Sequence, residues 1–204
     1  VNSFYIGIIA TIIATALGTL AALGLSRPHM PYKGLIMAIL ISPMIVPLII
    51  TAAGMFFFYA RINLVYTFTG VILAHVALAT PFVVITVTAT LVGFDMNMVK
   101  AAQSLGAKPM RTFFKVIMPL ILPGIISGAL FAFITSFDEV VIVMFMASID
   151  QLTIPKQMWA GIRQEISPVI LCMATCLVIL SIVLLTTVEL LRRRSERLRG
   201  IKAR

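Results

Sequence analysis

The sequence contains little charge for its length. Only 11% of its 204 residues are Asp, Glu, Lys or Arg, whereas 61% are hydrophobic and the mean hydropathy is +1.11. An ordinary soluble domain carries about 25% charged residues. The low charge therefore excludes a soluble domain of the usual kind and predicts a protein that lies in a membrane.

Cysteine and histidine are also scarce. Cys172 and Cys176 lie one helical turn apart in an apolar run, with no His or carboxylate near them at ligand spacing. We interpret them as small packing residues rather than as a disulfide framework or a metal pair. The Gly-x-x-x-x-Gly-Lys-Ser/Thr motif of nucleotide-binding loops is absent as well. We expect no metal, cofactor or catalytic residue on this chain.

Long apolar runs dominate the sequence. Each approaches or exceeds the roughly 20 residues that a helix needs to cross a bilayer. The runs do not alternate as membrane strands would, and helices satisfy their own backbone groups in lipid. The sequence predicts an all-α polytopic protein with one transmembrane domain over residues 1–204, and with spans at 4–25, 34–59, 70–93, 120–147 and 168–191. Because the chain opens with Val1, we expect it to begin inside a longer protein that has a sixth span before residue 1.

The net charge of +9 does not indicate a nucleic-acid partner, because the basic residues lie between the apolar runs. Thirteen of the sixteen Lys and Arg residues follow the first, third and fifth runs. The positive-inside rule places these three segments in the cytoplasm. The C-terminal tail, residues 192–204, is then cytoplasmic, and we expect it to touch anionic membrane lipid.

Three features inside the runs predict local structure. Small residues form one face of the first run and predict close packing against another helix, namely Gly7, Ala10, Ala14, Gly18 and Ala22. Pro43 and Pro47 predict kinks in the second run. His75 in the third run is either a relay or ligand contact, or, as we favour, a hydrogen-bonded histidine near the membrane interface.

Residues 94–118 are too polar to lie in lipid. Asp95 is a suitable N-cap for a short helix whose apolar stripe would be Met96, Val99, Ala102 and Leu105. Gly106 and Pro109 would end this helix, and a second amphipathic piece would begin at Pro109. A short helix across the ends of two spans can act as a lever on both.

Asp138 and Glu139 are the costliest residues for a membrane. A carboxylate at mid-bilayer costs about 2.5–3.5 kcal/mol on insertion scales. Because the run 120–147 is longer than one span needs, we expect Asp138 near the outer end, with residues 140–146 folding back. The alternative is a pair of carboxylates at a helix end with no functional role.

The central segment resembles the signature loop of the permease subunits of ABC importers. That loop reads Glu-Ala-Ala, three residues, Gly, about nine residues, then Ile-x-Leu-Pro. Ala101, Ala102, Gly106 and Pro119 fit the pattern, whereas Lys100 replaces the family's Glu and puts that one ion pair in doubt. The resemblance implies a type I importer permease core whose coupling helix docks on the ATPase through Lys100, Ala101, Ala102, Leu105, Gly106, Ala107 and Pro109.

A finer similarity, to the spermidine/putrescine branch of these permeases, covers residues 136–139, 152–159 and 162–168. It implies a small cationic solute, with Ser136, Phe137, Asp138 and Glu139 as candidate substrate or gate residues. It also implies two cytoplasmic ATPase subunits that bind ATP and Mg²⁺, a second permease subunit, an extracytoplasmic solute-binding protein and a bacterial inner membrane. The alternatives are a secondary transporter, disfavoured because no inverted repeat is evident, and a membrane hydrolase using Asp138 with His75 or Glu139, disfavoured because no nucleophile motif is present.

Overall fold

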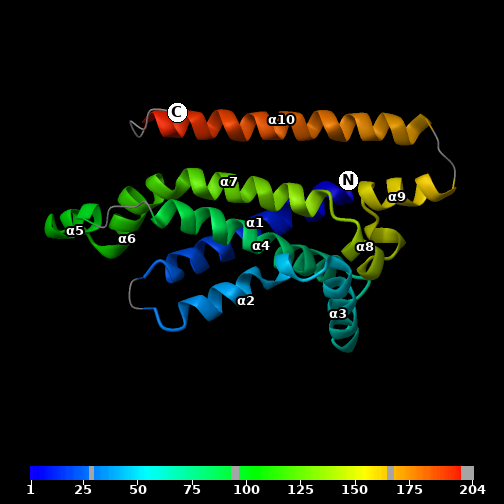
Figure 1. The fold of residues 1–204 in the computed structure, drawn as a ribbon, viewed down its shortest axis with the longest axis horizontal. Coiled ribbons are helices and arrows are strands. Elements are labelled where there is room, and N and C mark those ends of the chain that lie inside the picture. Colours follow the sequence, from blue (N-terminus) through cyan, green and yellow to red (C-terminus); the bar gives the residue numbers. More distant parts are fainter. Residues whose placement is uncertain (28–29, 93–96, 165–167, 199–204) are drawn as a thin grey trace.

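A computed structural model describes residues 1–27, 30–92, 97–164 and 168–198 (Figure 1). Within these residues the chain forms helices and no strand, which confirms the all-α prediction. The elements are α1 (Asn2–Leu25), α2 (Lys33–Ile45), α3 (Leu48–Arg61), α4 (Phe68–Val92), α5 (Asn97–Ser104), α6 (Pro109–Thr112), the π-helix η1 (Phe113–Ile117), α7 (Met118–Phe137), α8 (Val141–Met146), the 3-10 helix η2 (Ile149–Gln151), α9 (Ile154–Gln164) and α10 (Pro168–Leu198).

Helices α1, α4 and α7 pack against one another and form the core of the bundle. The five small residues of the first run are all buried on one face of α1, as predicted. At Gly18 an added Cβ would lie 2.6 Å from the Cβ of Val83 on α4. The small residues therefore set how closely these two helices approach.

Among the described residues, four helical stretches are long and apolar enough to cross a membrane. They are α1, α4, the continuous run Pro109–Phe137 formed by α6, η1 and α7, and residues 168–187 of α10. In the run Pro109–Phe137, the Met118 N–H donates a hydrogen bond to the Phe113 carbonyl, five residues earlier in the chain. This π-type turn lies directly before Pro119, and the helical stretch continues through it as one run.

The sequence predicted one kinked span over 34–59 for the second apolar run, and the structure differs from this prediction. It forms two helices, α2 and α3, bent by 103° at a short break. Pro47 has no N–H to continue the helix, and Val46 before it is extended, with φ −69° and ψ 135°. The pair counts as a fifth span only if it is treated as one broken span.

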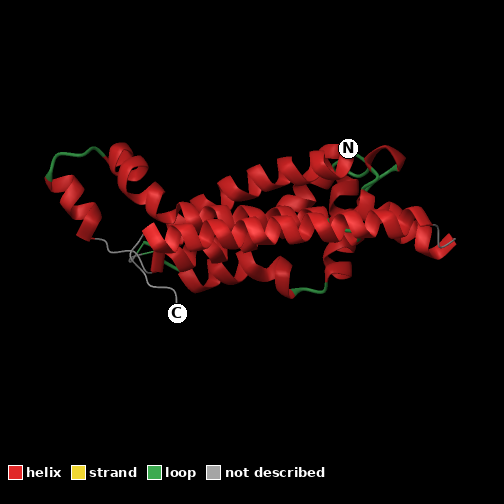
Figure 2. Cartoon of the chain, turned by 90° about the horizontal axis from the view of Figure 1, so that it is seen from above, coloured by secondary structure: helices red, strands yellow, loops and turns green. Residues whose placement is uncertain are grey.

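The bundle has two distinct ends. Helices α5 and α6 project from one end, and α8, α9 and the start of α1 lie at the other, which we call the far end (Figures 1 and 2). The run predicted over 120–147 ends at Phe137, and α8 follows as a separate short helix. Helix α10 lies alongside α7, beside the core rather than in it (Figure 1).

Candidate functional site

The signature segment begins with α5, which has no buried residue. Its turn carries paired hydrogen bonds, from Ala107 N–H to the Ala102 carbonyl and from Gly106 N–H to the Gln103 carbonyl. Gly106 between them has φ +80°. This is the Schellman ending of a helix, which requires a left-handed residue. The signature glycine is therefore explained by backbone conformation, since an added Cβ there would meet nothing within 4 Å.

Exposed apolar side chains mark the same segment. Leu105 is 88% exposed, and Met98 and Met110 are also largely exposed. Lys100, Ala101 and Pro109 are exposed, whereas Ala102 and Ala107 are half-buried. Leu105 thus leaves the stripe that Val99 and Ala102 still follow, and Asp95 and Met96 lie outside the described residues. A projecting element with exposed Leu and Met side chains is suited to a partner protein.

The two adjacent carboxylates at the far end have opposite surroundings. Asp138 is exposed, and it stands at the C-terminal end of α7, where the helix dipole disfavours negative charge. It has no ion-pair partner among the residues that the structure describes. Glu139 is only 7% exposed, and its Oε1 accepts a 2.8 Å hydrogen bond from the Ile142 N–H at the start of α8.

Burial raises the pKa of the Glu139 carboxyl, and the neighbouring charge of Asp138 acts in the same direction. Hydrogen bonds from the backbone of residues 140–142 oppose this rise. Glu139 therefore caps a helix inside the protein. Both carboxylates therefore stand at helix ends, but only Glu139 is buried as a cap, whereas Asp138 is exposed.

A small hollow of about 130 Å³ surrounds Asp138. Phe133 and Phe137 line it from α7, and their rings stack with centroids 5.4 Å apart. Pro155 of α9 and Ser181 of α10 also line it, and Ser181 contributes a hydroxyl group. A carboxylate beside two aromatic rings has the chemistry of an ammonium site, because both attract a cation.

Ser136 and His75 lie deeper. A 2.7 Å hydrogen bond joins Ser136 Oγ to His75 Nδ1 between α7 and α4, and His75 is 1% exposed. The histidine is hydrogen-bonded, as the sequence analysis favoured, and it is buried between helices. Of the four predicted residues, the structure brings Phe137 and Asp138 to the hollow and directs Ser136 and Glu139 to internal contacts.

Sequence reasoning missed three far-end residues that make long-range contacts. Asn2 Nδ2 donates to the carbonyls of Asp150 and Leu152, and Ser3 Oγ accepts from the Ile154 N–H. Lys156 Nζ donates to the carbonyls of residues 143 and 147. In the sequence, Lys156 was noted only as part of the stretch 152–159 and as one of the basic residues between the apolar runs, and neither observation predicted its contact with α8.

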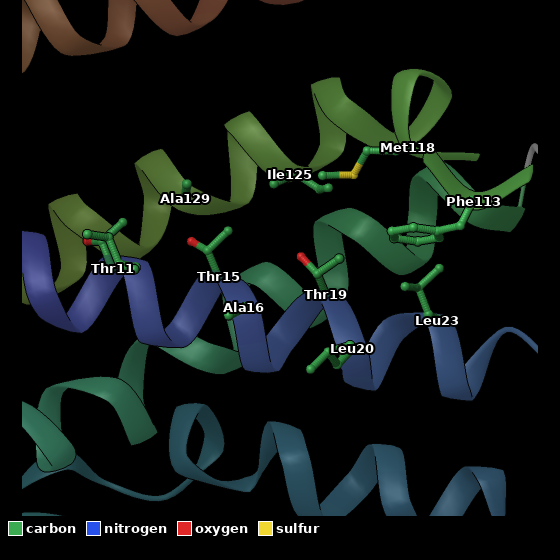
Figure 3. A pocket seen from close by; sticks show the side chains of 11 residues that line it. Thr11, Thr15, Ala16, Thr19, Leu20, Leu23, Phe113, Met118, Ile125 and Ala129 are labelled. Carbon is green, nitrogen blue, oxygen red and sulfur yellow. The ribbon is translucent and has the colours of Figure 1, made fainter. Parts of the chain in front are cut away.

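The sequence analysis also missed a groove between α1 and α7, of about 540 Å³. Thr11, Thr15 and Thr19 line it at four-residue spacing, with Phe113 and Met118 at one end (Figure 3). In the described part of the chain, the hydroxyls of Thr15 and Thr19 have no hydrogen-bond partner. The remaining lining is apolar, so the groove does not suit a charged solute.

Comparison with known proteins identifies the family. Residues 14–197 match the family described as "Binding-protein-dependent transport system inner membrane component". The chain is 30% identical, over 96% of its length, to the spermidine/putrescine transport system permease protein PotC of Haemophilus influenzae, of which it covers 76%. Over 50% of its length it is 37% identical to the putrescine transport system permease protein PotI of Escherichia coli K12, covering 37% of that protein.

A solved structure shares the fold. It is a chain of the MetNI methionine ABC transporter in inward-facing conformations, with TM-score 0.69 and 18% identity. The match covers 99% of this chain and 94% of that one. At this identity the likeness supports the architecture alone. With the family match it completes the assignment: this chain belongs to the binding-protein-dependent transport system inner membrane components, and is a multi-pass permease subunit of an ABC importer rather than an enzyme.

Proposed function

We propose that this permease passes a small cationic solute of the polyamine class, and that Asp138 contacts an ammonium group of that solute. The observation that carries the proposal is the exposed Asp138 carboxylate beside the stacked Phe133 and Phe137 rings. No cation of the described chain compensates Asp138, which stands at the negative end of α7. The relatives named for spermidine and putrescine support the same substrate class.

The orientation of the chain follows from its charge. The α5–α6 end would face the cytoplasm because the most basic segments lie at that end. Two ATPase subunits, which would hold ATP and Mg²⁺, would dock on residues 95–112. Leu105 would supply an exposed apolar contact, and Gly106 would set the direction of the chain after α5. The basic tail would lie on the same side and touch lipid.

The far end would then face outward. A solute-binding protein would deliver the solute there, close to the Asp138 hollow and to α9. A second permease subunit would complete the pathway. Closure of the ATPase subunits would move α5, and because the chain continues through η1 into α7, that movement would reach the helix that ends at Asp138.

Uptake by the reconstituted complex tests the substrate class. We expect labelled spermidine or putrescine to accumulate in proteoliposomes that contain the permeases, the ATPase and the binding protein. Asp138→Asn should raise the solute concentration for half-maximal uptake about fivefold, the upper range for an exposed charge pair. Asp150→Asn, which removes another exposed far-end carboxylate, should leave uptake unchanged. Uptake of neutral solutes with no response to polyamines would refute the cationic substrate.

A further inference from the structure

Helix α8 has its two ends held by opposite charges. At its start the Glu139 carboxylate accepts the Ile142 N–H, and at its end the Lys156 ammonium donates 3.2 Å hydrogen bonds to the carbonyls of Val143 and Ala147. Each charge has the sign that the helix dipole favours at that end. Glu139 comes from the α7–α8 junction, whereas Lys156 comes from α9.

The Lys156 contact is more than a local cap, because it spans separate elements. Helix α8 itself packs against α3 and α4, and its Met146 carbonyl accepts the Tyr66 N–H from the loop before α4. Lys156 therefore connects α9 to a helix seated on the core. Lys156 is half-buried, and this burial lowers the pKa of its ammonium group.

The segment between α8 and α9 is also fastened to α1. Asn2 binds the carbonyls of Asp150 and Leu152, and Ser3 binds the Ile154 N–H. Residues 150–156 are thus tied to α1 on one side and to α8 on the other. We call these contacts of Asn2, Ser3 and Lys156 the far-end clasp.

The clasp adjoins the Asp138 hollow. Pro155, which lies between the Ser3 contact and Lys156, forms part of the wall of that hollow. Withdrawal of Lys156 from α8 would move this wall and release the C-terminal end of α8 together. Lys156 thus holds α9 to α8, while Asn2 and Ser3 hold the same segment to α1.

We propose that Lys156 is a positioning residue that holds the far end of the pathway closed by tying α9 to α8, and that docking of the solute-binding protein releases this tie. The inference rests on the proposed function for the identity of the docking protein and for the outward orientation of the far end. It adds the residue that links docking to opening. The ammonium group acts through the carbonyls of Val143 and Ala147 and does not touch the solute.

Hydrogen–deuterium exchange of the complete complex in lipid nanodiscs tests the release directly. In the wild type, addition of solute-loaded binding protein should lower the protection of peptides covering residues 141–147, where Met144 and Ala147 donate helical hydrogen bonds. Lys156→Met should lower that protection about tenfold without any binding protein, since a hydrogen bond from a charged group has roughly that effect. Lys156→Arg should restore it, and Lys33→Met, which removes an exposed lysine from the start of α2, should not change it.

ATP hydrolysis supplies a readout that a purely structural role would not move. Lys156→Met should raise basal hydrolysis and reduce the further stimulation by binding protein, while the maximal rate stays close to that of the wild type. Asn2→Ala, on the other side of the clasp, should also raise basal hydrolysis, but by less. If the Lys156→Met complex fails to assemble, the basal hydrolysis of Asn2→Ala tests the clasp in its place.

Two results overturn the inference. One is wild-type protection of residues 141–147 that does not change on docking, and the other is a Lys156→Met complex with normal protection and basal hydrolysis. If the binding protein fails to stimulate ATP hydrolysis even by the wild-type complex, both the proposed function and this inference are refuted. Normal wild-type stimulation with an unaffected Lys156→Met complex refutes the clasp alone.

Discussion

At the scale of single residues, Asp138 and Glu139 show how far adjacent carboxylates can differ. Asp138 follows the last residue of α7 and points to a hollow, whereas Glu139 turns inward to cap α8. The difference arises because the chain changes direction between the two helices. Only Asp138 is available to a solute, so substitutions at the two positions should fail in different ways.

The cap predicts a stability effect at Glu139. Glu139→Ala should destabilise the purified complex by about 1 kcal/mol, the usual cost of losing a helix cap, whereas Glu139→Gln keeps an acceptor for the Ile142 N–H. Because the pKa of Glu139 is raised, the folded chain binds this proton more tightly than the unfolded chain. Thermal unfolding should therefore show wild type gaining stability relative to Glu139→Gln as the pH falls toward 4.5. A difference that does not vary with pH would contradict the burial of an ionisable Glu139.

Substitutions at Gly106 distinguish a requirement for its backbone conformation from a requirement for a small side chain. Its φ of +80° would cost an alanine about 1–2 kcal/mol, while asparagine tolerates this region better. We expect uptake in the order Gly, Asn, Ala, measured at equal levels of assembled complex. The reverse order of the two variants, with the larger Asn worse, would indicate that the ATPase surface and not the turn selects glycine.

At the scale of elements, the packing of α1 against α4 depends on missing side chains. Gly18→Ala would place a Cβ 2.6 Å from Val83 Cβ, so α1 or α4 must shift. Overpacking of this kind costs about 1–3 kcal/mol, and the melting temperature of the detergent-purified complex should fall. Gly24→Ala, at a position where an added Cβ meets nothing within 4 Å, is the matched control and should be neutral. Equal effects of the two variants would mean that α1 does not pack on α4 through Gly18.

At the scale of the whole molecule, the two ends should be reachable from opposite sides of the membrane. A chain with Cys172 and Cys176 replaced by alanine allows single cysteines at Ser104, on α5, and at Asp150, at the far end. In intact spheroplasts an impermeant thiol reagent should label the Asp150→Cys chain, and the Ser104→Cys chain only after the membrane is opened. Labelling of Ser104→Cys from outside would reverse the orientation proposed for the ATPase side.

The sequence by itself determined the helical membrane class, the small-residue face of α1 and the signature turn. Each depends on local chemistry, because the length of an apolar run, the spacing of small residues and a Gly-Ala-Lys-Pro segment are visible within a few helical turns. The family resemblance rested on the same local residues, and the comparisons confirm it.

The tertiary structure alone decided how these pieces meet. The 103° break between α2 and α3, the burial of His75 against Ser136 and the reach of Lys156 to α8 all join groups whose partners lie on other elements. Proline spacing predicted a kink but not its size, since packing fixes the angle. Composition counted Lys156 and Glu139 as charges and could not show which backbone groups they cap, because that depends on how α8 folds back onto the core.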